Sequence, residues 1–133
     1  MRQVYVDTSA FLALLDADEK NHPSASQIWR DLISSNAFLI CNNYVIVETF
    51  ALVQNRLGMN AVYDLYHGLL ASVEIIWTDE STFLTGVNIM LSANRKKLSI
   101  VDCTSFETMR RLGIKNAFTL DHHFAEQGFD IIP

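Results

Sequence analysis

Short apolar segments alternate with helical segments along this chain, and the alternation strongly limits the folds that it can adopt. We expect strands at 3–7, 38–41, 73–77, 117–120 and 129–132. We expect helices at 8–15, 21–34, 42–56, 60–70, 81–97 and 102–112. Strands and helices in this order favour a parallel sheet covered by helices on both faces. In such sheets, ligands bind beyond the carboxyl ends of the strands.

The length and composition suit a single domain over residues 1–133. Half of the residues are hydrophobic, which is enough for a self-sufficient core at this length. No apolar stretch reaches the roughly 20 residues of a membrane span, and no secretory signal opens the chain, so we expect a cytoplasmic protein with no membrane partner. Cys41 and Cys103 are far apart and are expected to be small buried hydrophobes.

Four carboxylates occupy positions where a folded chain has little reason to place a charge. Asp7 ends the apolar run of VYVDTSAF, and Glu48 interrupts YVIVETFALV. Asp102 follows LSIV, and Asp121 follows AFTL. Removing an ionised carboxylate from water costs several kcal/mol unless a partner compensates, and no similar set of buried-looking Lys or Arg residues accompanies these acids. A divalent cation would compensate for all four.

The expected elements bring these acids toward one edge of the sheet. Asp7 and Asp121 each come directly after a strand, Asp102 begins a helix, and Glu48 lies near the middle of another helix. Structural explanations also exist, because Asp7 and Asp102 could be helix N-caps and Asp121 an ordinary turn residue. Glu48 is harder to explain in this way, because its surroundings are almost wholly apolar and a cap cannot lie in mid-helix.

The charge pattern argues against binding of nucleic acid by bulk electrostatics, since the net charge is −5. Six of the ten basic residues nevertheless lie within positions 95–115 around Asp102. They are Arg95, Lys96, Lys97, Arg110, Arg111 and Lys115. They could form a basic rim around an acidic pocket, or they could be solvated cations near helix C-termini.

VDTSAF, the glutamate of VIVETF, SIVDCTSF and FTLDHHF together resemble the four acidic motifs of the PIN-domain nucleases. The likeness is greatest to the VapC-type toxins of toxin–antitoxin pairs and extends from Val4 to Phe129. His22, and His123 with the residues after it, also resemble those toxins. The resemblance implies a three-layer α/β/α sandwich with a central, mainly parallel sheet, one or two Mg²⁺ or Mn²⁺ ions, and cleavage of single-stranded RNA.

The resemblance assigns metal binding and catalysis to four acids, which are Asp7, Glu48, Asp102 and Asp121. Thr8 and Thr119 match hydroxyl residues beside the first and last acids, where they would orient a carboxylate or a water. Many relatives carry alanine and another apolar residue after the third acid, whereas this chain has Cys103, Thr104 and Ser105, which leaves the surroundings of that acid open. The resemblance also implies a homodimer and a small antitoxin that inserts a basic side chain among the acids.

The expected chemistry is phosphodiester hydrolysis by metal-activated water. Carboxylate oxygens are the ligands that Mg²⁺ prefers. A cation bound to the phosphate relieves repulsion of the nucleophile and lowers the pKa of a coordinated water. We expect a 5′-phosphate and a 3′-hydroxyl as products, without a covalent protein intermediate.

The sequence lacks the residue patterns of several other functions. A haloacid dehalogenase-type phosphatase needs a second aspartate where this chain has Ser9, and a receiver domain needs adjacent acids near the end of the first strand. The histidines show no HExxH pattern, and His122 and His123 are interpreted as surface or RNA-contacting residues. A housekeeping PIN-type RNA-processing nuclease, and an inactive RNA-binding or protein-binding module of the same fold, stay open as alternatives.

Overall fold

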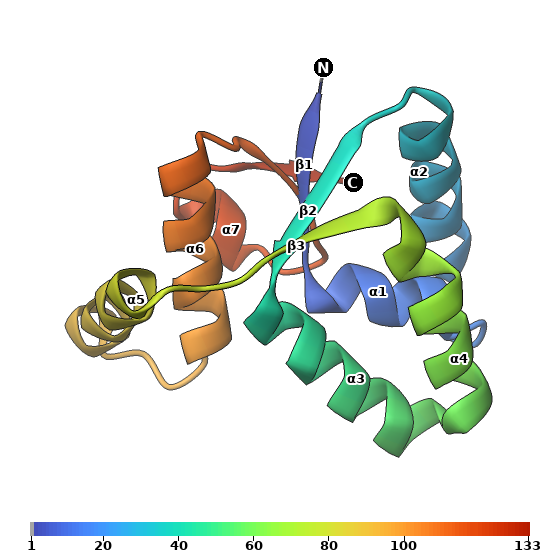
Figure 1. Cartoon of the computed structure of the whole chain (residues 1–133), viewed down its shortest axis with the longest axis horizontal. Coiled ribbons are helices and arrows are strands. Elements are labelled where there is room, and N and C mark those ends of the chain that lie inside the picture. Colours follow the sequence, from blue (N-terminus) through green and yellow to red (C-terminus); the bar gives the residue numbers. More distant parts are fainter. Residues whose placement is uncertain (1) are drawn as a thin grey trace.

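The computed structural model describes residues 2–133, and its centre is a sheet of five parallel strands (Figure 1). The strands are β1 (Gln3–Val6), β2 (Phe38–Asn42), β3 (Val73–Ile76), β4 (Asn116–Phe118) and β5 (Asp130–Ile132). Their order across the sheet is β3-β2-β1-β4-β5. The chain winds outward from β1 to β3 and then returns to place β4 on the other side of β1.

Helices cover both faces of this sheet. They are α1 (Thr8–Leu15), α2 (His22–Ser34), α3 (Asn43–Leu57), α4 (Met59–His67), α5 (Glu80–Ala93), α6 (Ile100–Leu112) and α7 (His123–Glu126), with a 3-10 turn, η1 (Leu69–Ser72). Figure 1 shows α1, α2 and α4 on one side and α5, α6 and α7 on the other. α3 contacts α1 and α4 as well as α6. The predicted three-layer α/β/α sandwich is confirmed. Within residues 2–133, every helix is too short or too polar to cross a membrane.

β1 lies at the centre of the sheet and is deeply buried. Val4, Tyr5 and Val6 have no exposed surface. The Tyr5 hydroxyl donates to Ser105 Oγ on α6 at 2.8 Å and accepts from the backbone N–H of Asn42 in β2 at 3.3 Å. This hydroxyl therefore ties the centre of the sheet to the neighbouring strand and to α6, and it fixes the carboxyl end of β1.

The observed helix ends refine the expected ones. Asn42 caps α3, because its side-chain oxygen accepts from the third amide of the helix, and Gly58 and Gly113 end α3 and α6 as expected. The helix expected at 81–97 stops earlier, where Asn94 adopts a left-handed φ of 50°. The helix expected at 60–70 is divided into α4 and η1, and α7 was not expected.

α5 and α6 approach closely where Gly86 faces Thr104. A Cβ atom added to Gly86 would lie 2.6 Å from Thr104 Cγ2 and 3.2 Å from its Cα and N atoms. Two of these three contacts involve backbone atoms, which cannot move away by rotation of a side chain. A glycine at residue 86 therefore lets α5 pack against α6, the helix that carries Asp102.

We predict that Gly86→Ala destabilises the protein by about 1–3 kcal/mol because of overpacking. The sign is opposite to the gain of roughly 1 kcal/mol that alanine usually brings to a helix. Unfolding in urea measures the effect. The double variant Gly86→Ala with Thr104→Ser removes the nearest methyl group and should regain part of the loss, whereas strictly additive losses would argue against this contact.

Candidate active site

The four acids meet at the carboxyl edge of the sheet, where the strand order reverses between β1 and β4. Asp7 directly follows β1, and Glu48 lies in the second turn of α3. Asp102 lies in the first turn of α6. The expectation for Asp121 was wrong in one detail, because β4 ends at Phe118 and the acid lies in the following loop. Carboxylate oxygens of Asp102 and Asp121 come within 4.8 Å of each other.

Asp7 is the most deeply buried of the four acids, with 5% of its surface exposed. Its Oδ2 atom accepts hydrogen bonds from the Ser9 hydroxyl at 2.8 Å and from the Thr119 hydroxyl at 3.0 Å. It also accepts from the Ser9 amide at 3.4 Å, as the N-cap of α1. Burial raises the pKa of Asp7, and these hydrogen bonds oppose the rise. Asp7 is therefore both a helix cap and one of the four acids at this edge. We call these four, Asp7, Glu48, Asp102 and Asp121, the acidic cluster.

Two hydroxyls connect the first acid to the loop that carries the last one. Thr119 donates to Asp7 and accepts from the backbone N–H of Asp121 at 2.9 Å. Ser9 donates to Asp7 and accepts from the backbone N–H of Leu120 at 2.9 Å. Thr119 is one of the expected orienting residues, whereas the role of Ser9 was not predicted from the sequence. Ser9 stands two residues after Asp7, a spacing at which an aspartate side chain often accepts a hydrogen bond, and this spacing could have indicated its role.

Glu48 is half-buried on α3 and lies beside Thr8 rather than in solvent. Burial raises the pKa of Glu48, and the negative charge of Asp7 adds to the rise, while a hydrogen bond from Thr8 lowers it. The Thr49 hydroxyl donates to the backbone carbonyl of Val45 at 2.6 Å, and its oxygen lies 3.3 Å from Thr8 Oγ1. The hydroxyl expected to orient the first acid thus supports the second one.

Asp102 is not the cap of its helix, so the structural explanation offered for it was wrong. Ser99 caps α6, and Asp102 is the third residue of the helix. The Asp102 amide donates to Ser99 Oγ at 3.0 Å, and the Ser99 amide donates to Asp102 Oδ2 at 3.2 Å, which makes a capping box. Burial raises the pKa of Asp102 to about 6, with further contributions from the charges of Asp7 and Asp121.

The residues after Asp102 belong to the core. Ser105 accepts from Tyr5, Thr104 packs against α5, and Cys103 has no exposed surface. Cys41 is also buried, and burial raises the pKa of its thiol to about 12. Both cysteines are free, as expected, and the departure from the family pattern after the third acid leaves the acidic cluster itself unaltered.

The acidic cluster has no cationic side chain of its own. Among residues 2–133, no Lys or Arg forms an ion pair with Asp7, Glu48, Asp102 or Asp121. The pKa values of the first three are raised, so each is destabilised in its ionised form. A set of gathered, uncompensated carboxylate oxygens fits a hard divalent cation such as Mg²⁺ or Mn²⁺.

His123 is buried, with 8% of its surface exposed, so its interpretation as a surface residue was wrong. It begins α7, and its ring Nδ1 lies 2.9 Å from Asp121 Oδ1. Its backbone N–H donates to the same oxygen at 2.9 Å. His122 is exposed, as expected. His123 therefore lies against the acidic cluster.

The arginines after position 94 are engaged by neighbouring elements rather than directed at the acids. Arg95 forms an ion pair with Glu126 at 2.8 Å, and Arg111 with Glu107 at 2.7 Å. Arg110 donates to the side chain of the residue after α7. These contacts are exposed and each contributes little to stability. Arg110 and Arg111 are exposed in the last turn of α6, as the helix-end alternative expected, and their contacts tie this helix to its surroundings.

The sequence and the fold match one family. A model of the PIN domain matches residues 4–130. The 23S rRNA-specific endonuclease VapC20 of Mycobacterium tuberculosis is 30% identical over 129 residues, which covers 95% of both chains. Ribonuclease VapC26 of the same organism is 27% identical over 122 residues, covering 90% of this chain and 88% of the relative.

Solved structures give the same result. The crystal structure of M. tuberculosis VapC20, described as a sarcin-ricin loop cleaving toxin, superposes with a TM-score of 0.83 at 29% identity and covers 95% of both chains. VapBC2 of Rickettsia felis, bound to a DNA fragment from its promoter, shares the fold with a TM-score of 0.71 at 14% identity over 98% of this chain and 97% of that one. The chain therefore belongs to the PIN-domain family and is homologous to the VapC endonucleases.

Proposed function

We propose that this protein is a metal-dependent endoribonuclease and the toxin of a VapBC-type pair. The observation that carries the proposal is the convergence of Asp7, Glu48, Asp102 and Asp121 on one edge of the sheet without a Lys or Arg partner among residues 2–133. The substrate class follows from the relatives, since VapC20 is named an rRNA-specific endonuclease and VapC26 a ribonuclease. The RNA that this chain would cut is single-stranded at the scissile bond.

In this proposal the four acids hold Mg²⁺ or Mn²⁺. A bound divalent cation supplies charge neutralisation at the phosphate and lowers the pKa of a coordinated water. Ser9 and Thr119 hold the Asp7 carboxylate in a single orientation, and Thr8 lies beside Glu48. Fixed carboxylates reduce the entropy that is lost when a cation binds.

The surroundings favour water as the nucleophile. The Ser9 hydroxyl already donates to Asp7 and accepts from Leu120, so it is not free to attack a phosphate. Cys103 is buried, and burial raises the pKa of its thiol. Attack by water on phosphorus with cleavage of the P–O3′ bond leaves a 5′-phosphate and a 3′-hydroxyl and requires no covalent intermediate.

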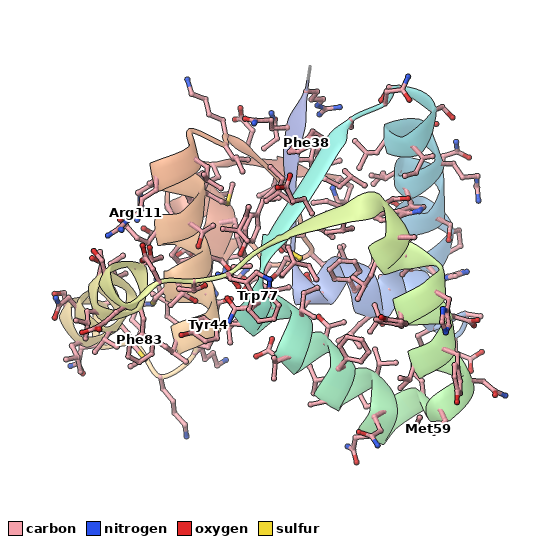
Figure 2. All side chains as sticks on the ribbon, in the orientation of Figure 1. Phe38, Tyr44, Met59, Trp77, Phe83 and Arg111 are labelled. Atoms are coloured by element: carbon pink, nitrogen blue, oxygen red, sulfur yellow. The ribbon has the colours of Figure 1, made fainter. Side chains whose placement is uncertain are left out.

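A small antitoxin is the proposed partner, and an apolar pocket beside the acids offers a place for it. The pocket has a volume of about 370 Å³ and is lined by Tyr44, Val47, Phe83 and Glu48, among others. Figure 2 labels Tyr44 and Phe83, which pack edge to face with ring centroids 6.1 Å apart. An amphipathic segment could cover this surface and place a basic side chain near Glu48. We also propose a homodimer, as expected for the family.

We predict that Asp7→Asn and Glu48→Gln each reduce cleavage of single-stranded RNA in Mn²⁺ by about 100-fold or more, because a lost cation removes several kcal/mol of transition-state stabilisation. The matched control is Glu74→Gln, which changes an exposed acid on β3 and should keep activity. Gel electrophoresis of labelled RNA measures the rate. Equal activity of all four proteins would refute the proposal, and absence of activity in the unaltered protein would favour an inactive binding module.

We predict that metal-free protein loses stability as the pH rises from about 4 to about 6. The pKa of Asp102 is about 6 in the folded protein against a usual 3.8, so between these values the folded state binds a proton that the unfolded state releases. Asp102→Asn removes this ionisation and keeps an oxygen for the capping box. The variant should therefore melt above the unaltered protein at pH 8 in a chelator and much closer to it near pH 4.5. Thermal melts across this range test it, and an unchanging difference would contradict it.

We also predict that Mn²⁺ or Mg²⁺ raises the melting temperature at neutral pH. A cation at 100 times its dissociation constant stabilises the folded state by about 2.7 kcal/mol. The stabilisation should largely disappear in Asp102→Asn, because a neutral amide is a weaker ligand than a carboxylate. A melting temperature that does not respond to millimolar metal would count against a cation site.

A further inference from the structure

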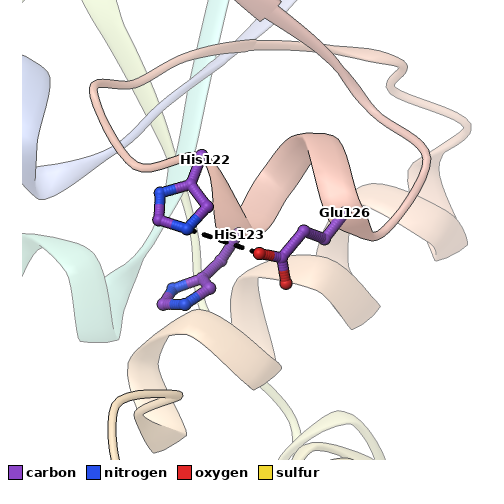
Figure 3. Close-up of side chains that lie close together, drawn as sticks. All are labelled: His122, His123 and Glu126. Atoms are coloured by element: carbon purple, nitrogen blue, oxygen red, sulfur yellow. Dashed lines mark ion pairs between the residues drawn. The ribbon is translucent and has the colours of Figure 1, made fainter.

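His123 is a buried side chain that the proposed function leaves without a role. It lies in two groups of side chains at once. Its ring is close to the carboxylates of Asp102 and Asp121, with ligand atoms of all three within 4.8 Å of one another. It also lies close to His122, the residue before α7, and to Glu126 on α7, which Figure 3 shows beside it. The position of its ring nitrogens decides between these groups.

The Nδ1 atom of His123 is fully buried and has no hydrogen-bond partner among residues 2–133. It nevertheless lies only 2.9 Å from Asp121 Oδ1, an oxygen that already accepts from the His123 amide. The approach is close, but it lacks the geometry of a hydrogen bond. Two adjacent ligands of an octahedral ion, each about 2.1 Å from the metal, lie about 3.0 Å apart. The observed separation fits two ligands of one cation, and the absence of a hydrogen bond between these two atoms leaves Nδ1 available for one.

We propose that His123 completes the cation site together with Asp102 and Asp121, and that its ring nitrogen makes the site favour Mn²⁺ over Mg²⁺. The inference rests on the proposed metal-dependent function and adds a ligand and a metal preference to it. Mg²⁺ is bound almost entirely by oxygen, whereas imidazole suits transition metals. Mn²⁺ accepts both kinds of ligand, so one nitrogen in a carboxylate set shifts the preference toward it.

The alternative group, His122 with His123 and Glu126, is less suited to a cation. Glu126 is already paired with Arg95 at 2.8 Å, and its distance from His122 Nε2 is 3.4 Å (Figure 3). A cation bound there would have to displace or repel the guanidinium. The His122 side chain is also largely exposed, so water competes for it. The unpartnered Nδ1 lies beside Asp121, on the side of the acidic cluster.

The test compares Mn²⁺ and Mg²⁺ binding by the unaltered protein, His123→Asn, His123→Leu and His122→Gln, using calorimetry. Loss of a metal ligand lowers affinity by about 10–100-fold. We expect that fall for Mn²⁺ in both His123 variants and a much smaller fall for Mg²⁺, so the ratio of the two affinities collapses. Pulsed electron paramagnetic resonance of bound Mn²⁺ gives a second readout, a nitrogen coupling that both His123 variants lose and His122→Gln keeps.

Several outcomes would overturn the inference. A nitrogen coupling that is absent from the unaltered protein, or an affinity ratio unchanged in His123→Asn, would exclude His123 as a ligand. Loss of the coupling in His122→Gln would place the metal on α7 instead. His123→Asn keeps a polar atom at the same branch point, so it remains informative where His123→Leu fails to fold. If Mn²⁺ binds but without the coupling, only this inference fails, whereas absence of all metal binding would refute the proposed function.

Discussion

The gathering of four carboxylates at one partly buried edge is the constraint on which the rest of the structure depends. Like charges repel, and burial removes the water that would stabilise each of them. Both effects raise the pKa of Asp102 to about 6. The fold holds Asp7 with the neutral hydroxyls of Ser9 and Thr119, and places the Thr8 hydroxyl beside Glu48, without a Lys or Arg partner. A neutral donor orients a carboxylate without cancelling its charge, so the negative potential stays available to a metal ion.

The topology makes this gathering possible. The strand order reverses between β1 and β4, so the segments that follow these strands are neighbours although more than one hundred residues separate them. Three helices also begin at this edge, where Asp7 caps α1, Asn42 caps α3 and Ser99 caps α6. The positive ends of the helix dipoles partly offset the crowded acids. A site that would be costly on a flat surface is tolerable here.

The distribution of cationic groups is consistent with a nuclease that carries a net charge of −5. Its arginines between α5 and α7 are paired with acids or amides of the same chain, as Arg95 is with Glu126. A protein with this charge has to attract a polyanion locally. Metal ions in the acidic cluster would provide that attraction at the scissile phosphate, where charge neutralisation also has a chemical use.

The sequence by itself determined the class of fold and the family, and it drew attention to the four acids that lie at one edge of the sheet. Each of these rests on a local pattern, such as an apolar run that ends in Asp7 or the mid-helix position of Glu48. Only the tertiary structure decided which groups surround the acids. It showed that Ser9 holds Asp7, that Ser99 rather than Asp102 caps α6, and that His123 is buried while its neighbour is exposed. Hydrogen bonds and burial depend on residues from distant parts of the chain, and no local pattern records which of them will meet.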